Sequence, residues 1–376
     1  MNNEIKVGII GVSADRGWAS VAHIPALNAL PEYKLSAISN RNRDAAEKAG
    51  TTYNVPHVFE TIDDLVNSPD VDLVVVTVKV PHHKELVDAA LNAGKNVFCE
   101  WPLGNGLEEA EEMLQLANSK GLYGAVGLQS RAVPAINYVR DLVAQGYVGE
   151  VLSTSMIGSG IFYGAFIEQA SAWAMDARNG AGMIYSTFAN SVDALCYTLG
   201  EFTELNATAV NRRTETRVIE TGEVIPMDVF DQIAVTGILE NKAVATIHFR
   251  GGMSKGTNFF WEINGTKGDL VITANGGHPG VFELTIKGSQ GEKALEILTV
   301  PSSYYKVKMD TIQGPAYNVA ENYARLASDL IHGTHLSANF EDAVVRHRMI
   351  HAIEKAAKTG TRQVYNYQPS FSDQLK

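Results

Sequence analysis

Glycines follow the first apolar segment of the chain at a spacing that suits phosphate chemistry. Residues 8–18 read GIIGVSADRGW, and a helix-like apolar stretch comes directly afterwards. Glycine lets the backbone approach a pyrophosphate, and the N-terminus of the next helix offers free N–H groups and a positive dipole end. The spacing departs from G-x-G-x-x-G, so the motif is weak by itself. We expect it to form a dinucleotide site from Gly11, Val12, Ser13, Gly17 and Trp18.

The end of the second strand-like segment carries information about the cofactor. A site for NAD usually has an Asp or Glu about 20 residues past the glycines, which binds the ribose 2′-hydroxyl. This chain has Ser39-Asn40-Arg41 there. An arginine can hold a 2′-phosphate through two parallel hydrogen bonds. Asn40 and Arg41 therefore favour NADP, with NAD as the alternative, although a solvated arginine in a turn gives the same pattern.

These residues need a scaffold, and the first third of the chain supplies one. Strand-like runs at 6–10, 34–39, 71–78, 96–99 and 123–127 alternate with helix-like segments at 20–30, 43–49, 62–66, 83–93 and 107–120. Continuous apolar runs such as VDLVVVTVKV are typical of strands buried on both faces of a parallel sheet. Residues 1–125 are thus predicted to form an α/β doubly wound parallel sheet of the Rossmann type.

The remaining residues, 126–376, follow a different pattern. Helices are expected at 134–145, 183–199, 317–332 and 340–358, and strand-like segments at 151–160 and throughout 203–298. This predicts a C-terminal α/β domain with a large, mostly antiparallel open sheet, whose final helices pack back towards the Rossmann domain.

Composition narrows the function classes. The 376 residues are 45% apolar and 19% charged with a net charge of −11, and the chain has no basic cluster, which disfavours nucleic acid as a partner. Cys99 and Cys196 form no CxxC pair, and no apolar stretch approaches the roughly 20 residues that span a bilayer. We expect a cytoplasmic protein without membrane contact. His347 and His351 share a helix face, but no third ligand is near in sequence and no metal site is expected.

An ordered series of motifs resembles the Gfo/Idh/MocA family of NAD(P)-dependent oxidoreductases across the whole chain. The series comprises Val7–Ile10, His23–Ala26, Val74–Thr77, His83, Ala93–Val97, Glu100-x-Pro102, Gln145–Gly149, Trp173-x-x-Asp176, Gly180–Gly182, Asn264–Gly268 and the closing helix over 340–360. The resemblance implies a nicotinamide site between two domains. It also implies that Thr77, Val78, His83, Glu100, Trp101 and Pro102 contact the cofactor.

The family's catalytic side chains are missing from their expected positions. The resemblance implies a lysine in Glu-Lys-Pro, and an aspartate and a histidine four residues apart on a helix; this chain has Trp101, Ser186 and Asn190. Neither an indole nor a carboxamide acts as a general base near neutral pH, and a serine needs a base beside it. The replacement of all three catalytic side chains indicates that the function of this site has changed.

Two functions remain open. The first is an NADP(H)-dependent oxidoreductase for a sugar or polyol derivative, in which Tyr163, Tyr185 or His83 handles the proton; a structural role is the alternative for each. The second is a nucleotide-binding sensor or co-regulator without turnover, because parts of the sequence resemble the family's fungal galactose-pathway repressor. Those parts are Gly11–Ala19, Glu100-Trp101, Gln129–Pro134 and Gln145–Gly149.

A sugar-like ligand would meet polar groups and an aromatic face. The resemblance places Arg131, Trp173, Asp176 and Asn190 near such a ligand, although a purely structural role is an equally good interpretation of each residue. Association into a homodimer or homotetramer through the C-terminal sheet is also expected from the family. Neither the substrate nor the choice between dimer and tetramer can be read from the sequence.

Overall fold

The computed structural model describes residues 4–308, 310 and 312–364, which divide into two compact units. One holds the residues as far as Ala132 together with Tyr305–Val344, and the other holds Val133–Tyr304 together with the chain from Val345 onward. The sequence prediction instead divided the chain at residue 125 and kept both final helices in the second part. The two units are considered one at a time below.

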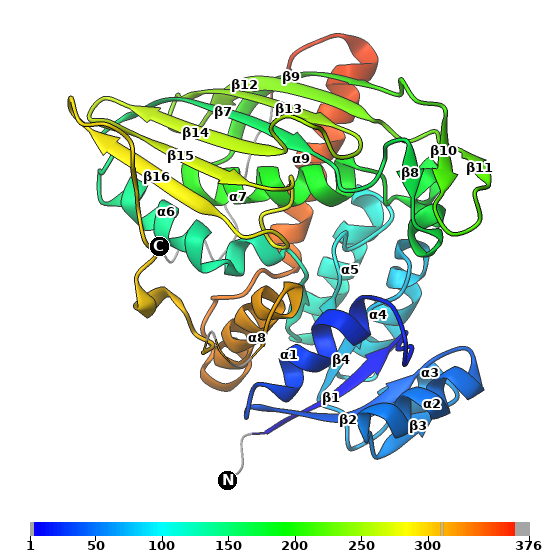
Figure 1. Cartoon of the computed structure of the whole chain (residues 1–376). Coiled ribbons are helices and arrows are strands. Elements are labelled where there is room, and N and C mark those ends of the chain that lie inside the picture. The colour runs from blue at the N-terminus through cyan, green and yellow to red at the C-terminus, as the bar shows by residue number, and fades with distance from the viewer. Residues whose placement is uncertain (1–3, 309, 311, 365–376) are drawn as a thin grey trace. The chain divides into compact units, whose positions relative to one another are not determined.

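The first unit contains a six-stranded sheet in the order β3-β2-β1-β4-β5-β6. All five strand pairs are parallel. The strands are β1 (Ile5–Ile10), β2 (Tyr33–Ser39), β3 (His57–Phe59), β4 (Leu73–Val76), β5 (Asn96–Cys99) and β6 (Gly124–Val126). This order, which reverses beside β1, is that of a doubly wound dinucleotide-binding fold, so the predicted Rossmann sheet is confirmed. Figure 1 shows these strands and their helices in blue and cyan.

Helical segments connect these strands and cover the sheet. They are the π-helical η1 (Ala19–His23), α1 (Ile24–Asn28), α2 (Arg43–Tyr53), α3 (Ile62–Val66), the 3₁₀ segment η2 (Val80–His82), α4 (His83–Asn92), α5 (Leu107–Lys120), the 3₁₀ segment η3 (Gln129–Ala132) and α8 (Pro315–His332). Strands β1 and β4 are buried on both faces, with Val7, Ile9 and Val75 at 0% exposure. That burial explains the uninterrupted apolar runs of the sequence.

Helix α8 comes from late in the chain but belongs to the first unit. It contacts η1, α1 and η3. Tyr323 is fully buried and its ring stacks on Phe98 of β5, with ring centroids 5.1 Å apart. Tyr33 of β2 donates a hydrogen bond to the Tyr323 carbonyl at 2.8 Å. An element almost 200 residues beyond β6 therefore completes the core of the first unit.

The second unit is built on a nine-stranded sheet in the order β17-β16-β15-β14-β7-β13-β12-β9-β18. Its strands are β7 (Val151–Ser159), β9 (Phe202–Val210), β12 (Gln232–Leu239), β13 (Val244–Arg250), β14 (Phe259–Gly265), β15 (Gly268–Ala274), β16 (Thr285–Gln290), β17 (Glu296–Ile297) and β18 (Gln363–Val364). Only β7 and β13 run parallel among the pairs of this sheet in the described residues. The prediction of a large, mostly antiparallel sheet is confirmed.

A smaller sheet was not predicted. It has the order β11-β10-β8 and consists of β8 (Phe166–Ile167), β10 (Glu215–Val218) and β11 (Val224–Pro226). Two of these strands are only two or three residues long, which is too short for a period to be visible in sequence.

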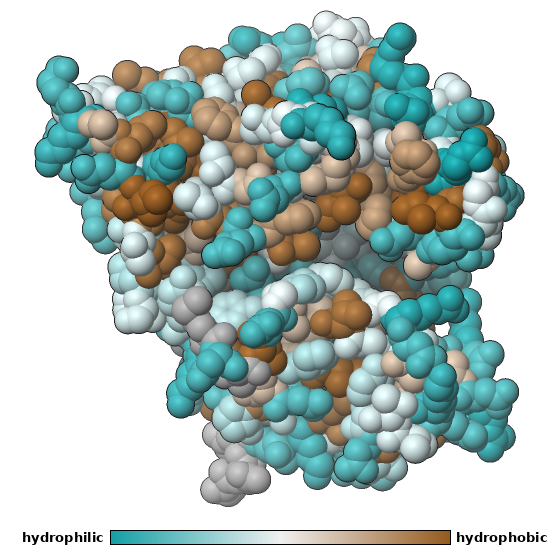
Figure 2. Space-filling model, viewed as in Figure 1, coloured by the Kyte–Doolittle hydropathy of each residue, from teal (hydrophilic) through white to brown (hydrophobic). Residues whose placement is uncertain are grey.

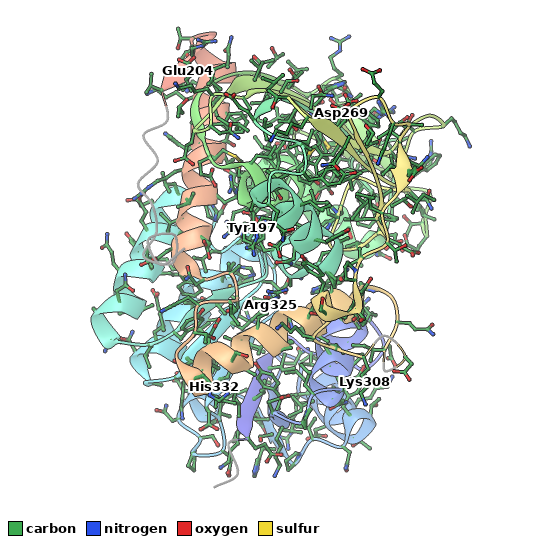
Figure 3. All side chains as sticks on the ribbon, turned by 90° about the vertical axis from the view of Figure 1, so that its left-hand side faces the viewer. Tyr197, Glu204, Asp269, Lys308, Arg325 and His332 are labelled. Carbon is green, nitrogen blue, oxygen red and sulfur yellow. The ribbon has the colours of Figure 1, made fainter. Side chains whose placement is uncertain are left out.

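Helices line one face of the large sheet, as Figure 1 shows for α6 (Pro134–Ala144) and α7 (Ala189–Leu199). Helix α7 is preceded by the π-helical turn η6 (Ile184–Phe188), and α9 (Phe340–Thr359) comes just before β18. The ring of Phe188 meets that of Phe249 on β13 edge to face at 5.5 Å. Tyr197 of α7, labelled in Figure 3, receives a hydrogen bond from Arg140 of α6 and lies 4.7 Å below its guanidinium.

Apolar side chains are also found on the surface, where Figure 2 shows them interspersed with polar ones. Among the exposed ones in the second unit are Leu152, Phe166, Ile219 and Val244. Within the residues that the structure covers, no helix has the length and apolar character needed to cross a membrane. Over the same residues, no group of three His, Cys, Asp or Glu side chains is placed to hold a metal ion.

Candidate functional site

The turn after β1 is shaped around Gly11. Its φ is +97°, and a Cβ at this position would lie 2.8 Å from Val78 Cγ1 and 3.2 Å from the Thr77 carbonyl oxygen. The turn is fixed from both sides, because Gly11 N donates to the Ser39 carbonyl at 2.9 Å and Thr77 Oγ1 donates to the Ile10 carbonyl at 2.8 Å. A side chain at residue 11 would therefore collide with the turn that follows β4. The carboxyl ends of β1 and β4, on either side of the point where the strand order reverses, are where a doubly wound sheet binds a dinucleotide.

Other predicted cofactor residues lie along the same loop. Gly17 has a φ of +95° with open space around its Cβ position. Trp18 precedes η1, and its buried indole N–H has no hydrogen-bond acceptor among the described residues. Val12 is buried, while Ser13 is half-buried and its carbonyl accepts a hydrogen bond from Ser20 Oγ. The glycines and the free indole donor fit an anionic group held near the loop.

The end of β2 reaches across to the same loop. Asn40 Nδ2 donates to the Val12 carbonyl at 2.6 Å, and Asn40 Oδ1 accepts from Asn42 N at 3.0 Å. Asn40 therefore builds the turn. Arg41 extends towards the start of α4, where its Nη2 lies 2.8 Å from Glu85 Oε1 and 3.3 Å from His82 Nδ1. The sequence prediction included Arg41 but neither of its partners, which lie more than 40 residues away in the chain.

His83 is a structural residue in this geometry. It is 1% exposed; its Nδ1 lies 2.9 Å from the Pro102 carbonyl, and its Nε2 lies 3.0 Å from the Val78 carbonyl. Burial lowers the pKa of His83 against the opposing effect of these carbonyls. The ring thus connects the turn after β4 to the loop after β5, so it is poorly placed to take a proton from a ligand. That loop carries Trp101, which is 9% exposed.

A buried polar chain ends at Glu100, directly after β5. Glu100 Oε1 lies 2.9 Å from His23 Nε2, and His23 Nδ1 lies 2.7 Å from the Tyr323 hydroxyl. Burial keeps the pKa of Tyr323 far above its usual value, so Tyr323 stays protonated. Its hydroxyl therefore donates a hydrogen bond to His23 Nδ1. His23 then donates from Nε2 to the carboxylate. Gln129 Nε2 adds contacts of 3.3 Å to each carboxylate oxygen.

Glu100 was a predicted cofactor residue, but the sequence analysis assigned no role to His23, Gln129 or Tyr323. On the side of Gly127 the chain packs closely against the carboxylate. A Cβ on Gly127 would lie 2.8 Å from Glu100 Oε1. The sequence signals for this chain of contacts are the motif that begins at His23 and the repressor-like motif that begins at Gln129.

In the second unit, one of the replaced family positions, Ser186, is hydrogen-bonded to Tyr163, and the other, Asn190, is hydrogen-bonded to Ser186. The Tyr163 hydroxyl lies 2.8 Å from the Ala181 carbonyl and 2.8 Å from Ser186 Oγ. Asn190 Nδ2 donates to the Ser186 carbonyl at 3.1 Å. We call Tyr163, Ser186 and Asn190 the hydroxyl–amide cluster. Its members come from the loop after β7, from η6 and from α7.

The electrostatics of the hydroxyl–amide cluster are those of neutral groups. Burial raises the pKa of Tyr163 to about 12, so the phenol stays protonated and donates to the Ala181 carbonyl. Ser186 can then donate to the phenol oxygen. Asn190 is 5% exposed, and its Oδ1 accepts no hydrogen bond from the described residues. The cluster can therefore offer hydrogen bonds to a polar ligand but has no group that exchanges protons near neutral pH.

Tyr185 is engaged elsewhere. Its hydroxyl donates to Glu354 Oε1 of α9 at 3.2 Å. Burial, with the nearby Glu354 charge, raises the pKa of Tyr185. The pKa of Glu354 is also raised by burial. The Tyr185 hydroxyl is thus directed to α9, although Tyr185 adjoins Ser186 in sequence.

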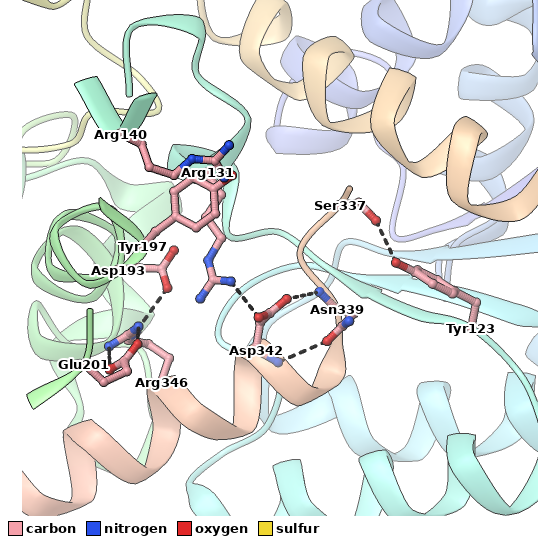
Figure 4. A network of polar contacts seen from close by, with 10 residues as sticks. All are labelled: Tyr123, Arg131, Arg140, Asp193, Tyr197, Glu201, Ser337, Asn339, Asp342 and Arg346. Atoms are coloured by element: carbon pink, nitrogen blue, oxygen red, sulfur yellow. Dashed lines mark hydrogen bonds and ion pairs between the residues drawn. The ribbon is translucent and has the colours of Figure 1, made fainter. Parts of the chain in front are cut away.

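The predicted ligand residues already have protein partners. Arg131 Nη1 contacts Asp342 Oδ1 at 2.6 Å, and Asp342 forms a reciprocal capping pair with Asn339 at the start of α9 (Figure 4). Arg178 contacts Asp176 at 2.6 Å and lowers its pKa. Trp173 is half-buried, and its carbonyl accepts from Asn179 at 2.6 Å. These contacts favour the scaffold alternative for Arg131 and Asp176.

A fully buried ion cluster holds α7 in place. Arg346 of α9 donates to Asp193 Oδ1 at 3.0 Å and to the two oxygens of Glu201 at 2.7 and 3.2 Å (Figure 4). Asp193 lies one turn after Asn190 on α7. This Arg346 cluster therefore positions the helix that carries part of the hydroxyl–amide cluster.

Comparison with known families agrees with this division of the chain. Residues 5–128 match the family described as "Oxidoreductase family, NAD-binding Rossmann fold". Residues 134–274 match that described as "Gal80p, C-terminal domain". The chain joins a Gfo/Idh/MocA-type Rossmann domain to a Gal80p-like C-terminal domain.

Relatives of both kinds are known. Dehydrogenase aclE of Aspergillus oryzae is 28% identical, over 98% of this chain and 100% of its own length. The galactose/lactose metabolism regulatory protein GAL80 of Saccharomyces cerevisiae is 29% identical, over 75% of this chain and 69% of its own.

Among solved structures, a super-repressor mutant of Gal80p from Saccharomyces cerevisiae gives a TM-score of 0.87 at 23% identity, covering 96% of this chain and 99% of that one. Levoglucosan dehydrogenase in complex with NADH and levoglucosan gives 0.82 at 20% identity, covering 96% and 98%. At these identities the structural likeness shows the fold. The hydroxyl–amide cluster belongs to the Gal80p-like domain, and the Gly11 turn belongs to the Gfo/Idh/MocA-type domain.

Proposed function

We propose that this protein is an NADP(H)-dependent oxidoreductase that acts on a sugar or polyol derivative. The observation that carries the proposal is the Gly11 turn at the carboxyl end of β1, where positive φ and the nearness of Val78 and Thr77 leave no room for a side chain. The match to an NAD-binding Rossmann family supports the same assignment. The sugar class is suggested by levoglucosan dehydrogenase, which shares the fold.

The dinucleotide would be held by the Gly11–Trp18 loop, with Arg41 at the ribose 2′-phosphate and the Thr77-Val78 turn beneath. No carboxylate directly follows β2, which favours the phosphorylated cofactor. When bound, the nicotinamide ring supplies or accepts the hydride. Trp101 is proposed to lie against the nicotinamide end, in the space where the family has a lysine.

The proton that accompanies hydride transfer needs a protein group, and Glu100 is our candidate. His83, Tyr163 and Tyr185 are each held by other protein groups. The Glu100 side chain is 16% exposed and is oriented by its contacts with His23 and Gln129. A carboxylate can accept a proton from a substrate hydroxyl within hydrogen-bond reach. In this proposal Glu100 takes the proton, and His23 and Tyr323 are positioning residues.

A second candidate function is a dinucleotide-dependent sensor or co-regulator without turnover. The hydroxyl–amide cluster favours it, because the two family proton-handling positions in this unit hold a serine and an amide, while the Tyr163 phenol stays protonated. The regulatory protein GAL80 is among the relatives. Such a protein would bind cofactor and ligand as signals. Arg131, Trp173 and Asp176 remain our proposed contacts for the ligand in either case, and the ligand would have to displace Asp342 from Arg131 and Arg178 from Asp176.

Binding and turnover separate the two functions. NADPH binding is measured through its own fluorescence and through quenching of tryptophan, with Trp101→Phe expected to remove most of the quenching. Oxidation of the bound NADPH is then followed at 340 nm with a panel of keto-sugars. Oxidation that is lost in Glu100→Gln supports the enzyme, whereas tight binding without oxidation of any panel member supports the sensor. Absence of binding refutes both.

Assembly is a separate proposal. We propose a homodimer or homotetramer through the uncovered face of the large sheet. Its outward positions include Ser155, Thr236 and Thr246, which are aligned in register across β7, β12 and β13. Small and β-branched side chains on a sheet face pack well against a second sheet. Light scattering coupled to size exclusion should give a mass above that of a monomer.

A further inference from the structure

The ion pair between Arg41 and Glu85 crosses the dinucleotide crevice of the first unit. Arg41 follows β2, and Glu85 lies in the first turn of α4, which follows β4. Strands β2 and β4 are the two neighbours of β1 in the sheet. A contact between groups that follow them therefore passes over the carboxyl end of β1. In a doubly wound fold that place belongs to the adenosine half of the cofactor.

The pair is close but exposed. Arg41 Nη2 lies 2.8 Å from Glu85 Oε1, with side-chain exposures of 73% and 58%. His82 Nδ1 lies 3.3 Å from the same Glu85 oxygen. An ion pair this exposed contributes little to stability, so a ligand can open it at small cost. Arg41 then has several N–H donors free to turn towards an incoming anion.

Neighbouring charges are already paired. Arg43 contacts Glu47 at 2.9 Å and Glu60 at 2.7 Å, and Lys48 contacts Asp15 at 2.6 Å. None of these carboxylates contacts Arg41 in the described residues. Glu85 is consequently the acidic group that competes directly for the Arg41 guanidinium.

We propose that Glu85 is a specificity-determining residue that holds NADP affinity down and lets NAD bind at the same site. A 2′-phosphate brings between one and two negative charges beside Arg41 and must displace Glu85. A 2′-hydroxyl brings none, and it can donate to the Glu85 carboxylate much as it donates to the acidic residue found after β2 in NAD sites. The inference rests on the proposed cofactor site, but not on turnover.

The test is a binding titration of NADPH and NADH against Glu85→Gln. Removing one carboxylate near a phosphate at high effective dielectric should tighten NADPH binding about three- to tenfold. NADH binding should stay the same or weaken. The NADPH gain should shrink as salt is raised from 0.05 to 0.5 M, because exposed charges are screened.

The matched control is Asp70→Asn. It removes the same charge from an exposed ion pair with Lys6, at 2.8 Å and 38% and 45% exposure, at the opposite end of β1. Asp70→Asn should leave both dissociation constants within a factor of two. Arg41→Gln should weaken NADPH binding and abolish the gain from Glu85→Gln in the double variant.

The outcomes are distinct. Equal NADPH affinity for the wild type and Glu85→Gln, or weaker affinity for the variant, would overturn the inference and leave the proposed cofactor site standing. If Asp70→Asn reproduces the gain, the effect comes from net charge and the inference also fails. If the wild-type protein binds neither nucleotide, the proposed function fails and removes the basis of the inference.

Discussion

Replacing Arg346 with methionine should destabilise the second unit more than any other single removal of charge that we predict. The substitution keeps an unbranched side chain but removes the cation that lies between Asp193 and Glu201. Arg346 and Asp193 are both at 0% side-chain exposure, and Glu201 is at 8%. Removing one partner of a buried ion pair costs about 3–5 kcal/mol, mostly because the remaining charges stay desolvated. We expect Arg346→Met to lower the free energy of unfolding by that amount.

The assay is thermal and urea denaturation followed by circular dichroism. For a unit of this size, a loss of about 3–5 kcal/mol corresponds to a fall in Tm of roughly 6–20 °C. Arg131→Met is the comparison in the first unit, where one partly exposed pair at 12% and 8% exposure is lost and a smaller fall is expected.

A triple variant separates charge from packing. Arg346→Met combined with Asp193→Asn and Glu201→Gln removes both uncompensated charges, so it should recover part of the lost stability. If Arg346→Met costs less than about 1 kcal/mol, the cluster is not desolvated as the structure indicates. If the triple variant is no more stable than Arg346→Met alone, the loss comes from packing and the electrostatic explanation is wrong.

Three further outcomes are expected. Gly11→Ala should weaken NADPH binding more than Gly17→Ala. Both substitutions strain a backbone with positive φ, but only the first places a methyl group against Val78. Equal losses of NADPH affinity in titrations of the two variants would contradict this. Tyr163→Phe should cost about 1–3 kcal/mol in urea denaturation, since the Ala181 carbonyl loses its buried donor, and an unchanged midpoint would refute the contact. Burial raises the pKa of Glu321 above 4.5, so the folded state keeps a proton that the unfolded chain releases. Stability from Glu321 is therefore complete below that pH and is lost as pH rises through the folded pKa. The stability of Glu321→Gln relative to the wild type should therefore increase as the pH rises from about 4 to 7. Parallel pH profiles of the two free energies of unfolding would refute this.

The parallel sheet was predictable because local signals carry it. Strands β1, β4 and β5 are continuous apolar runs between clear helices, and the prediction for β5 and α5 matches the observed bounds. Strand β3 was missed because His57–Phe59 is only three residues long and exposed to half-buried. The first helix is one predicted segment that the structure divides into η1 and α1.

Contacts distant in sequence could not be predicted in the same way. The parallel pairing of β7 with β13 joins strands almost 90 residues apart, and alternation in either strand carries no information about its partner. Arg131 and Asp342 are 211 residues apart in the chain, so their ion pair could not be predicted from the sequence. The charge of Arg131 therefore suggested a ligand contact instead. From the sequence alone, Arg346 would be predicted to be a solvent-exposed residue of a charged helix. Only the folded chain brings Asp193 and Glu201 into contact with it.

The family motifs supply positions for Ser186 and Asn190 but not their contacts. Asn190 donates to the Ser186 carbonyl, and the Ser186 hydroxyl lies against that of Tyr163. What the sequence did not show is that the Tyr163 proton is held by a backbone carbonyl. Burial and partner geometry decide that, and both depend on the folded chain.

The hydroxyl–amide cluster has a consequence for how this protein would respond to its surroundings. A phenol with a pKa of about 12, an alcohol and a carboxamide keep the same proton count from mildly acidic to mildly alkaline solution. A ligand that bonds only to these groups would be held with the same affinity across that range. With the Asp and His of the family at these positions, ligand affinity would change with pH. With the hydroxyl–amide cluster, binding depends on the concentration of the ligand and not on pH.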